Sequence, residues 1–384
     1  MQKKLKIIRV TTKPEAFLLL LRGQLKFINN FHNLIGVSSP GEKLLEVKNK
    51  EGIRVIPLNM TRKITPIRDF FSLIKMILIL IKEKPDLVHS HTPKAGVIAM
   101  LASRICRIPH RIHTVAGLPL METSGIKKKF LIFVEWLTYI CATKICPNSY
   151  GLKKFIEDNI YFSKNKIKVI GNGSSNGVDL KYFDRNYEVN SSSVIFKKKY
   201  NLENLFSFIF IGRIVKDKGI EELLKAFLNL NNEFKNIRLI IVGYEEKDLD
   251  PISDSAKNIL LMNKNIINLG FKSDIRPFLA SSDCLVLPSY REGFPNVVLQ
   301  ASSMQVASIV SDINGSNEII SNDLNGLLVQ PKDIDSLYLA MKKIYMDKDL
   351  CRSLAISAKK IVTKKFDKDF IHNEILSFYS KLNN

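Results

Sequence analysis

The chain has 384 residues, of which 46% are hydrophobic and 25% are charged, a composition typical of globular rather than disordered proteins. This length is sufficient for two domains that each bury a core. The formal net charge of +21 is concentrated in residues 1–190, which hold 32 Lys and Arg against 14 Asp and Glu. The remaining residues hold 26 against 23, so the charge indicates an acidic partner for the first half alone.

Sequence signals for several other classes of protein are missing. The five cysteines form no Cys-x-x-Cys pair, which favours reduced thiols in a cytoplasmic protein over a disulfide framework. The apolar run at 16–21 is too short for a secretory signal, and no stretch reaches the roughly 18 apolar residues that a spanning helix needs. We also find no nucleic-acid-binding motif. We therefore expect a cytoplasmic protein that does not bind nucleic acid and does not span a membrane.

The first half alternates short apolar strands with helical stretches, which predicts a parallel, doubly wound sheet. We predict helices at residues 67–84, 95–106 and 127–138, and strands at residues 5–10, 34–37, 54–58, 87–89, 111–115, 144–146 and 168–170.

Polar segments follow several of these strands, at the sheet edge where α/β folds bind ligands. No Gly-x-Gly-x-x-Gly follows the first strand, which argues against a dinucleotide site in this half. His89 ends the strand at 87–89, His91 follows it, and Lys94 lies in the helix begun by Pro93. No third ligand accompanies the two histidines, so we do not expect a metal there.

Two segments of the basic half are suited to an anionic membrane surface. The three lysines at 127–129 run directly into the apolar residues 130–137. Residues 73–81 are a second mostly apolar helical run, interrupted by Lys75. Both patterns also suit helices packed against a sheet. We favour burial for 73–81 and leave both alternatives open for the segment after Lys127.

The second half repeats the alternation of strands and helices. Residues 184–204 are rich in Asn, Ser and Lys and predict a linker. We therefore expect domains at 1–185 and 186–366, followed by a helix at 367–384. Strands are predicted at residues 206–211, 239–242, 266–269, 284–287, 308–310 and 327–329.

The most informative stretch is residues 289–300, which follow the buried strand at 284–287. Glu292 stands where this strand ends, Gly293 permits a close backbone approach, and Pro295 suits the start of a helix. The amide groups that open such a helix bind anions. One loop thus offers a carboxylate for hydroxyl groups and amides for phosphates, a combination that suits a sugar nucleotide. Taken alone, Glu292 is equally typical of a solvated loop carboxylate.

Residues 292–295, Glu-Gly-Phe-Pro, resemble the signature of the retaining family-4 glycosyltransferases of GT-B fold, in which a second Glu follows eight positions after the first. The resemblance implies two Rossmann-like domains facing across a cleft, with the last helix crossing back to the first domain. It also implies that Glu292 contacts the transferred sugar and that position 300 contacts the ribose. Here Gln300 replaces the second Glu; it keeps hydrogen bonding but brings no negative charge. The donor site would further include Gly212, Gly293, Phe294, Pro295, Asn296 and Glu318.

The same resemblance places Arg213 and Lys218 on the nucleotide diphosphate. The chemistry needs such cations, because a departing diphosphate gains negative charge in the transition state. Asp248 with Asp250, and Asp333 with Asp335, do not closely follow apolar strands, and we interpret them as loop or helix-cap residues. We therefore expect neither a metal nor another cofactor.

Residues 89–96 and 111–119 resemble bacterial family-4 enzymes that extend lipid-linked capsule or O-antigen precursors. Relatives often carry His where Ala116 stands, which leaves His113 as the nearest imidazole for catalysis. The turn at 176–179, Asn-Gly-Val-Asp, matches the family and is interpreted as architectural. The acceptor side would include Gly23, His91, Lys94 and Gly117, although Gly23 is also explained by a plain turn.

The sequence thus predicts a retaining, metal-independent glycosyltransferase. The donor would be a UDP-hexose or UDP-N-acetylhexosamine, and the acceptor a polyprenyl-diphosphate-linked glycan at the cytoplasmic face of the inner membrane. Two alternatives remain open at this point. One is a nucleotide-sugar 2-epimerase of the same fold, which leaves the charge of the first half unexplained. The other is a non-enzymatic protein that binds sugar nucleotides or membranes.

Overall fold

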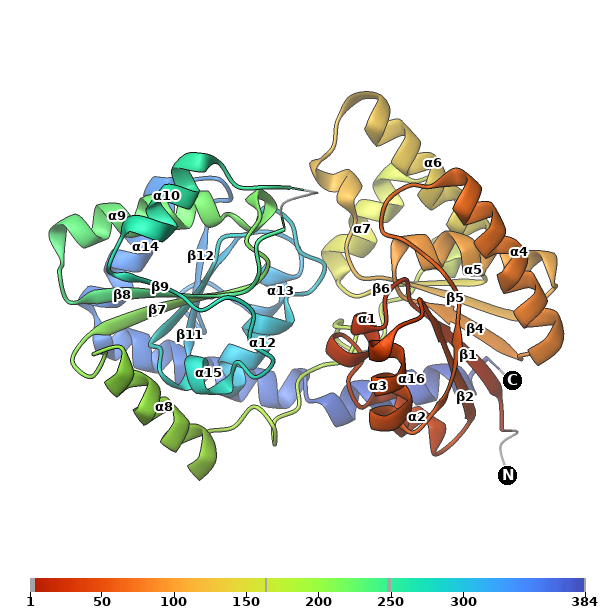
Figure 1. The fold of residues 1–384 in the computed structure, drawn as a ribbon, viewed down its shortest axis with the longest axis horizontal. Helices are drawn as coiled ribbons and strands as arrows, with labels where there is room; N and C mark the ends of the chain where they lie inside the picture. The colour runs from red at the N-terminus through yellow and green to blue at the C-terminus, as the bar shows by residue number, and fades with distance from the viewer. Residues whose placement is uncertain (1–3, 163, 247–249, 383–384) are drawn as a thin grey trace. The chain divides into compact units, whose positions relative to one another are not determined.

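The computed structural model describes residues 4–162, 164–246 and 250–382. The chain divides into two compact units (Figure 1). Unit 1 consists of Met1–Asn176 with Asp369–Asn384, and unit 2 of Gly177–Lys368. The sequence had predicted a division after residue 185.

Unit 1 is built on a parallel six-stranded sheet with the strand order β3-β2-β1-β4-β5-β6. Its strands are β1 (Lys6–Val10), β2 (Asn33–Ser38), β3 (Arg54–Pro57), β4 (Leu87–Ser90), β5 (His110–Val115) and β6 (Lys144–Pro147). Its helices are α1 (Glu15–Leu19), α2 (Gln24–Asn29), α3 (Glu42–Glu51), α4 (Pro66–Glu83), α5 (Pro93–Ile105), α6 (Gly125–Cys141), α7 (Tyr150–Asn159) and α16 (Lys368–Ser380).

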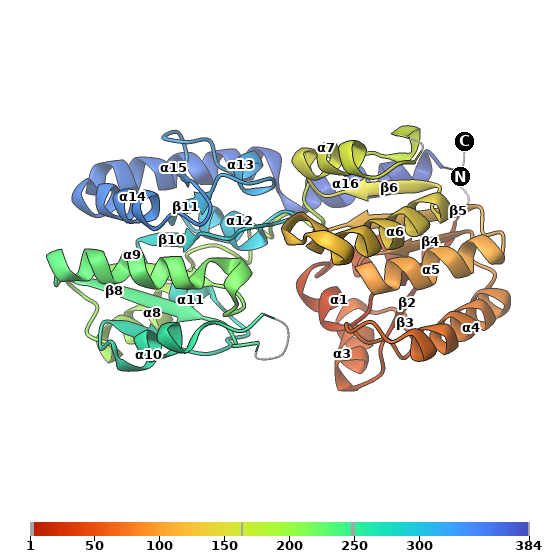
Figure 2. The ribbon, with the colours of Figure 1, turned by 90° about the horizontal axis from the view of Figure 1, so that it is seen from above.

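Successive side chains of β1 pack on opposite faces of this sheet, as expected for a strand buried on both faces. Ile8 and Val10 belong to a buried cluster with residues of α4, α5, α6 and α7. Ile7 belongs to a second cluster with residues of α2, α3 and α16. Helices therefore cover both faces, which confirms the doubly wound α/β prediction (Figure 2).

Unit 2 repeats this topology with the order β12-β11-β10-β7-β8-β9. Its strands are β7 (Phe206–Ile211), β8 (Ile237–Val242), β9 (Ile266–Asn268), β10 (Cys284–Leu287), β11 (Ala307–Ser311) and β12 (Leu327–Val329). Its helices are α8 (Tyr187–Lys199), α9 (Ile220–Glu233), α10 (Asp254–Met262), α11 (Arg276–Ala280), α12 (Asn296–Ser303), α13 (Ser316–Ile319), α14 (Ile334–Met346) and α15 (Lys348–Lys365).

Two predictions about local structure are wrong. Residues 168–170 form no strand, because the chain turns at Gly171 and Gly173, both at positive φ, after one isolated bridge between Ile145 and Ile167. The linker predicted at 184–204 contains helix α8 instead. The polar composition of this segment led to the linker prediction, although its buried residues recur at helical spacing. Val189 and Phe196 of α8 belong to the core of unit 2.

The last helix packs against the sheet of unit 1, as the resemblance implied. Ile371, Ile375 and Phe378 of α16 lie in the buried cluster that contains Ile7 of β1. The connection into α16 is held by the turn at 176–179: Val178 exchanges backbone hydrogen bonds with Phe366 and Lys368, at 2.9 Å each. This confirms the architectural interpretation of that turn.

Helix α4 differs from the prediction that residues 73–81 are buried. Met76 and Leu80 face the core, but Leu78 is 60% exposed and Ile81 is 58% exposed. Among the described residues, none of the helices is both long enough and apolar enough to span a bilayer.

The carboxylate of Glu83, at the end of α4, ties this helix to the sheet. It accepts hydrogen bonds from Arg54 of β3, the shorter at 2.7 Å, and lies 2.8 Å from Nζ of Lys6 of β1. The hydrogen bonds from Arg54 and Lys6 lower the pKa of this carboxyl from 4.5 to about 2. A carboxyl whose pKa falls on folding stabilises the fold above its unfolded pKa. The contribution is therefore complete above about pH 4.5 and is lost as the pH falls towards 2.

We expect Glu83→Gln to lower the free energy of unfolding of unit 1 by about 1–2 kcal/mol at pH 7, since solvent screens the two partly exposed cations. Urea unfolding followed by the fluorescence of Trp136, the single tryptophan, reports on unit 1. The difference from wild type should shrink at pH 3. Glu46→Gln, which removes exposed ion pairs to Lys43 and Lys50, is the control and should change little. Equal stability of wild type and Glu83→Gln at pH 7 would contradict this assignment.

Candidate functional site

The candidate donor site lies where the strand order of unit 2 reverses. β7 and β10 are hydrogen-bonded neighbours, although the chain leaves β7 towards β8 and leaves β10 towards β11. Ligands of open α/β sheets bind outside the carboxyl ends of such a pair of strands. Gly212 and Arg213 follow β7, and the stretch from Pro288 to Glu292 follows β10.

Glu292 and Lys218 form an ion pair at this edge. Nζ of Lys218 donates to Oε1 of Glu292 at 2.5 Å, and the side chains are only 18% and 12% exposed. Oγ of Ser289 donates to the same oxygen at 2.8 Å. Asn314, which follows β11, donates its side-chain amide to the carbonyl of Glu292 at 2.7 Å. Lys218 and Ser289 thus hold the carboxylate of Glu292, and Asn314 holds its backbone.

Arg213 is held by a carboxylate as well. Its guanidinium donates to Glu246, which follows β8. Burial lowers the pKa of Arg213, but the hydrogen bond to Glu246 and the nearby charge of Asp217 outweigh it, so the net pKa is raised. Arg213 therefore remains charged, and both predicted phosphate-binding cations are positioned by acidic partners.

Glycines allow the loops around these cations to approach each other closely. A Cβ on Gly219, at φ +66°, would lie 1.9 Å from the carbonyl oxygen of Pro288. A Cβ on Gly315, at φ +78°, would lie 2.3 Å from the carbonyl oxygen of Gly293. Side chains at these two positions are excluded both by backbone conformation and by space.

Helix α12 starts beside Glu292 and contains the remaining residues of the signature. Pro295 is its N-cap and Asn296 its first residue, so the free amides of the first turn are close to the loop. Gln300 lies one turn further and is partly exposed. Phe294 is 7% exposed and its ring packs 5.3 Å from that of Phe366, so its side chain belongs to the core. Glu318 lies partly exposed on the short helix α13.

In unit 1, His113 is buried at 2% exposure within β5. Its Nδ1 lies 2.8 Å from Oγ of Ser90, and its ring covers Gly96, where a Cβ would come within 2.5 Å of the imidazole. Burial lowers the pKa of His113 to about 4, so the ring is neutral at pH 7.

The other predicted acceptor-side residues have different surroundings. The ring of His91 packs at a tilt against that of His89, with 4.1 Å between centroids, and its two ring nitrogens have no hydrogen-bond partner among the described residues. Lys94 forms an ion pair with Asp69 of α4 at 2.6 Å. Gly23, at φ +78°, donates its amide to Glu51 at 2.7 Å. Gly117, at φ +147°, lies between β5 and α6. The structure does not join these residues into one hydrogen-bonded cluster.

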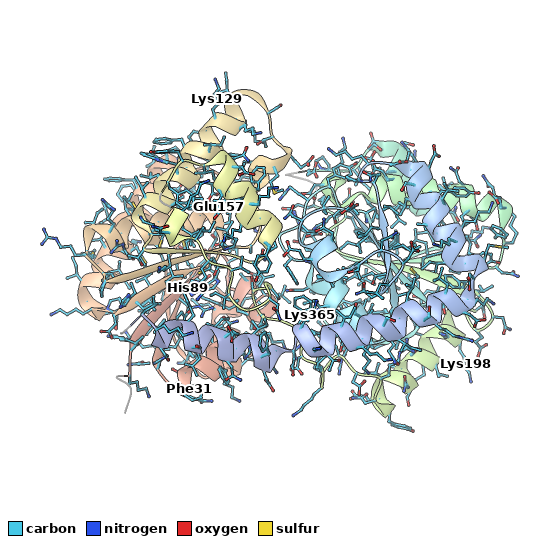
Figure 3. All side chains as sticks on the ribbon, turned by 180° about the vertical axis from the view of Figure 1, so that it is seen from behind. Phe31, His89, Lys129, Glu157, Lys198 and Lys365 are labelled. Atoms are coloured by element: carbon cyan, nitrogen blue, oxygen red, sulfur yellow. The ribbon has the colours of Figure 1, made fainter. Side chains whose placement is uncertain are left out.

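A buried polar network that the sequence analysis missed lies beneath His91. The fully buried Arg9 of β1 donates to the hydroxyl of Tyr379 at 2.7 Å and to Gln24 at 2.5 Å. The same hydroxyl lies 2.6 Å from Nδ1 of His89, which is in the interior of unit 1 (Figure 3). An arginine inside an apolar strand was the available signal, because such a charge is buried only with polar partners.

The pairs of aspartates behave as expected for caps and loops where the structure describes them. Asp333 caps α14 by accepting hydrogen bonds from the amides of Asp335 and Ser336. Asp250 accepts a hydrogen bond from the amide of Asp217 at 2.7 Å. Asp248 lies outside the described residues. Within the described part of the chain, no three His, Cys, Asp or Glu side chains are grouped so as to hold a metal ion.

Comparison with known proteins decides the family. The family model described as "Glycosyl transferases group 1" matches residues 193–361, and the model described as "Glycosyl transferase 4-like" matches residues 16–149. The capsular polysaccharide biosynthesis glycosyltransferase CapM of Staphylococcus aureus is 33% identical over 98% of this chain and 97% of its own length. The chain belongs to this glycosyltransferase family.

Two further glycosyltransferases are similar over most of the chain. UDP-Gal:alpha-D-GlcNAc-diphosphoundecaprenol alpha-1,3-galactosyltransferase of Escherichia coli is 31% identical over 80% of each chain. N,N'-diacetylbacillosaminyl-diphospho-undecaprenol alpha-1,3-N-acetylgalactosaminyltransferase of Campylobacter jejuni is 27% identical over 93% of this chain and 94% of its own.

Solved structures confirm the fold of this glycosyltransferase. The crystal structure of Anabaena Alr3699/HepE in complex with UDP has a TM-score of 0.81 at 20% identity, covering 98% of this chain and all of the other. A glycosyltransferase from Rickettsia africae has a TM-score of 0.77 at 21% identity, covering 100% and 99%. The two Rossmann-like units therefore form the GT-B fold predicted from the sequence.

Gly219→Ala should destabilise unit 2 by several kcal/mol, because the new methyl group meets the Pro288 carbonyl in addition to a strained backbone. Gly270→Ala is the matched control: Gly270 also has φ +66°, but nothing lies within 4 Å of its Cβ position, so only about 1–2 kcal/mol is expected. Urea unfolding followed by circular dichroism measures the loss, and Trp136 fluorescence reports separately on unit 1. Equal losses in the two variants would show that the close approach at Gly219 is not required.

Proposed function

We propose that this glycosyltransferase transfers a sugar from a UDP-sugar, held by unit 2, to a polyprenyl-diphosphate-linked glycan, held by unit 1, with retention of configuration and without a metal. The observation that carries the proposal is the ion pair between Lys218 and Glu292 at the strand-order reversal of unit 2. It places a cation for phosphate beside a carboxylate for sugar hydroxyl groups.

Arg213 and Lys218 are the proposed partners of the donor diphosphate. Without a donor, Glu246 and Glu292 hold these cations in position, so little reorganisation is needed when an anion arrives. The amides at the start of α12 add further donors of fixed direction. Preorganised positive groups stabilise the charge that develops as the diphosphate leaves. Because two side-chain cations supply this charge, we propose that no divalent ion is needed.

Glu292 is proposed to bind hydroxyl groups of the transferred sugar, with Ser289 and Asn314 fixing its orientation. Gln300, one helical turn from the start of α12, is proposed to bind the ribose through its amide. Gly212, Gly293, Phe294, Pro295 and Asn296 are assigned to the donor site through their backbone, and Glu318 to its nucleotide side.

The proposed acceptor follows from the two relatives named for undecaprenyl-diphosphate-linked substrates. The excess of basic residues in the first half suits an acceptor that carries a diphosphate and lies at an anionic membrane surface. We place the protein at the cytoplasmic face of the inner membrane. His113, neutral at pH 7 and oriented by Ser90, is proposed to bind the attacking hydroxyl rather than a phosphate. His91, Lys94, Gly23 and Gly117 remain proposed acceptor-side residues.

We further propose attack on the face from which the diphosphate leaves. The bond between the acceptor oxygen and the anomeric carbon forms as the bond from that carbon to the phosphate oxygen breaks. The acceptor proton passes to the departing diphosphate. This route retains configuration and requires no enzyme nucleophile.

Arg213→Ala and Glu292→Ala should each lower the turnover number about 10²- to 10³-fold, the range typical of a lost transition-state contact. The assay measures UDP release from a panel of UDP-sugars, with and without undecaprenyl-diphosphate-linked acceptors, in EDTA. Arg213→Lys is the matched variant and should recover part of the rate, because it keeps the charge but not the fork of donors. Release without an acceptor, or turnover unchanged in Arg213→Ala, would refute the proposal; interconversion of the UDP-sugar would instead indicate an epimerase.

Gln300→Ala should weaken UDP binding by about five- to ten-fold, the loss of one hydrogen bond of about 1 kcal/mol. Gln300→Glu, which restores the carboxylate typical of the family, should bind UDP at least as well as wild type. Isothermal titration calorimetry measures both. Equal affinity of Gln300→Ala and wild type would remove this residue from the ribose site.

A further inference from the structure

Helix α4 carries apolar side chains on two opposite faces. Ser72, Met76 and Leu80, at positions i, i+4 and i+8, are buried against the rest of unit 1. The opposite face carries six large apolar residues at helical spacing, each 39% to 76% exposed: Ile67, Phe70, Phe71, Ile74, Leu78 and Ile81. Leu73, Ile77 and Ile79 are partly buried against the same core. Six exposed large apolar residues on the other side are unusual for a helix that merely covers a sheet.

The charges of α4 are sorted around this stripe. Arg68, Lys75 and Lys82 are exposed and stand seven residues apart, so they form a row along one flank of the stripe. The two carboxylates of the helix are turned away from it. Asp69 is bonded to Lys94 of α5, and Glu83 to Arg54 and Lys6. The outer face of α4 is therefore apolar and basic.

We propose that α4 binds the surface of an anionic lipid bilayer, lying in the plane of the interface with its apolar stripe among the acyl chains and its basic row at the headgroups. This inference rests on the proposed function only in that a lipid-linked acceptor requires access to a membrane. The sequence analysis had left this role open for the segment after Lys127 and had favoured burial for residues 73–81.

Charge favours a bilayer over a second copy of the chain. An interface between two copies would bring two basic rows near each other, whereas anionic headgroups attract each of them. Helix α6 extends the same kind of surface, because α4 and α6 both pack on α5. Its exposed residues Ile126, Phe130 and Phe133 stand beside the lysines at 127–129, of which Lys129 lies at one extremity of unit 1 (Figure 3).

Flotation of the full chain with vesicles tests the proposal. Vesicles of phosphatidylcholine and phosphatidylglycerol, without any glycan acceptor, should bind wild type, and phosphatidylcholine alone should bind it far less. The double variant Phe71→Gln/Leu78→Gln should lose at least about ten-fold in partitioning. Lys75→Gln/Lys82→Gln should lose roughly 20- to 30-fold, about five-fold for each lysine, and added salt should reduce this difference.

Helix α8 of unit 2 provides matched controls. Val194 and Ile195 are 51% and 68% exposed, and Lys198 and Lys199 follow them on the surface. Val194→Gln/Ile195→Gln and Lys198→Gln/Lys199→Gln remove the same kinds of group and should leave vesicle binding unchanged. Unfolding measured by Trp136 fluorescence checks that the α4 variants keep the fold of unit 1.

Several outcomes would overturn the inference. These are failure of wild type to bind anionic vesicles, equal losses in the α4 and α8 variants, or a wild-type dimer that Phe71→Gln/Leu78→Gln converts to a monomer in sedimentation. The last result would assign α4 to an interface between copies.

A water-soluble, short-chain diphosphate-linked acceptor separates this inference from the proposed function. Turnover with that acceptor but no vesicle binding would refute the inference alone, and vesicle binding without turnover on any acceptor would refute the proposed function alone.

Discussion

The reversal of strand order at the centre of each sheet determines where this glycosyltransferase can bind its ligands. β7 and β10 pair directly, so the segments that follow them meet at one edge although helices and strands separate them in the chain. A parallel sheet requires a crossover between successive strands, and two sets of crossovers leaving in opposite directions open a space at the reversal. Lys218 and Glu292 meet there, and the glycines that face Pro288 and Gly293 allow the loops to close around them.

The ion pair between Lys218 and Glu292 differs from the ion pairs of Glu83, which stabilise the fold. Glu83 joins α4 to two strands, and its lowered pKa shows that the folded state favours its charged form. Lys218 and Glu292 are similarly buried, but each is a group that a sugar nucleotide could bind. A mostly buried pair with a small exposed fraction keeps both charges ordered while leaving them accessible to a ligand that satisfies them differently. In the proposed function, contacts with a diphosphate and a sugar replace this pair.

Unit 1 contains a buried polar network in the corresponding place. Tyr379 of α16 accepts a hydrogen bond from Arg9 and contacts His89, so the last helix of the chain orders residues at the centre of the sheet. The fully buried guanidinium of Arg9 would be costly without these partners. Removing α16 would therefore expose apolar residues that it covers, such as Ile7 of β1, and leave the buried charge of Arg9 without its hydroxyl partner. The C-terminal helix is part of the core of unit 1 rather than an appendage.

The sequence determined much of the fold, because strands and helices are indicated by local patterns of apolar residues. Apolar runs with intervening helical periods predicted twelve of the strands, and the stretch around Glu292 indicated a site for a sugar nucleotide before any contact was known. Two of the errors arose where composition and spacing disagree. In α8, polar residues surround the buried Val189 and Phe196, and at residues 168–170 an apolar run ends at two glycines of positive φ.

The tertiary structure alone decided which side chains meet. Packing between distant segments pairs Lys218 with Glu292 and Lys94 with Asp69. It also turns an apolar face of α4 outward. A helical period shows that one stripe is apolar, but a helix that is apolar on two sides gives no local signal for which side faces the core. For α4 that choice was made by its neighbours: cations on α5 and on strands β1 and β3 bind its two carboxylates and so fix the rotation of the helix.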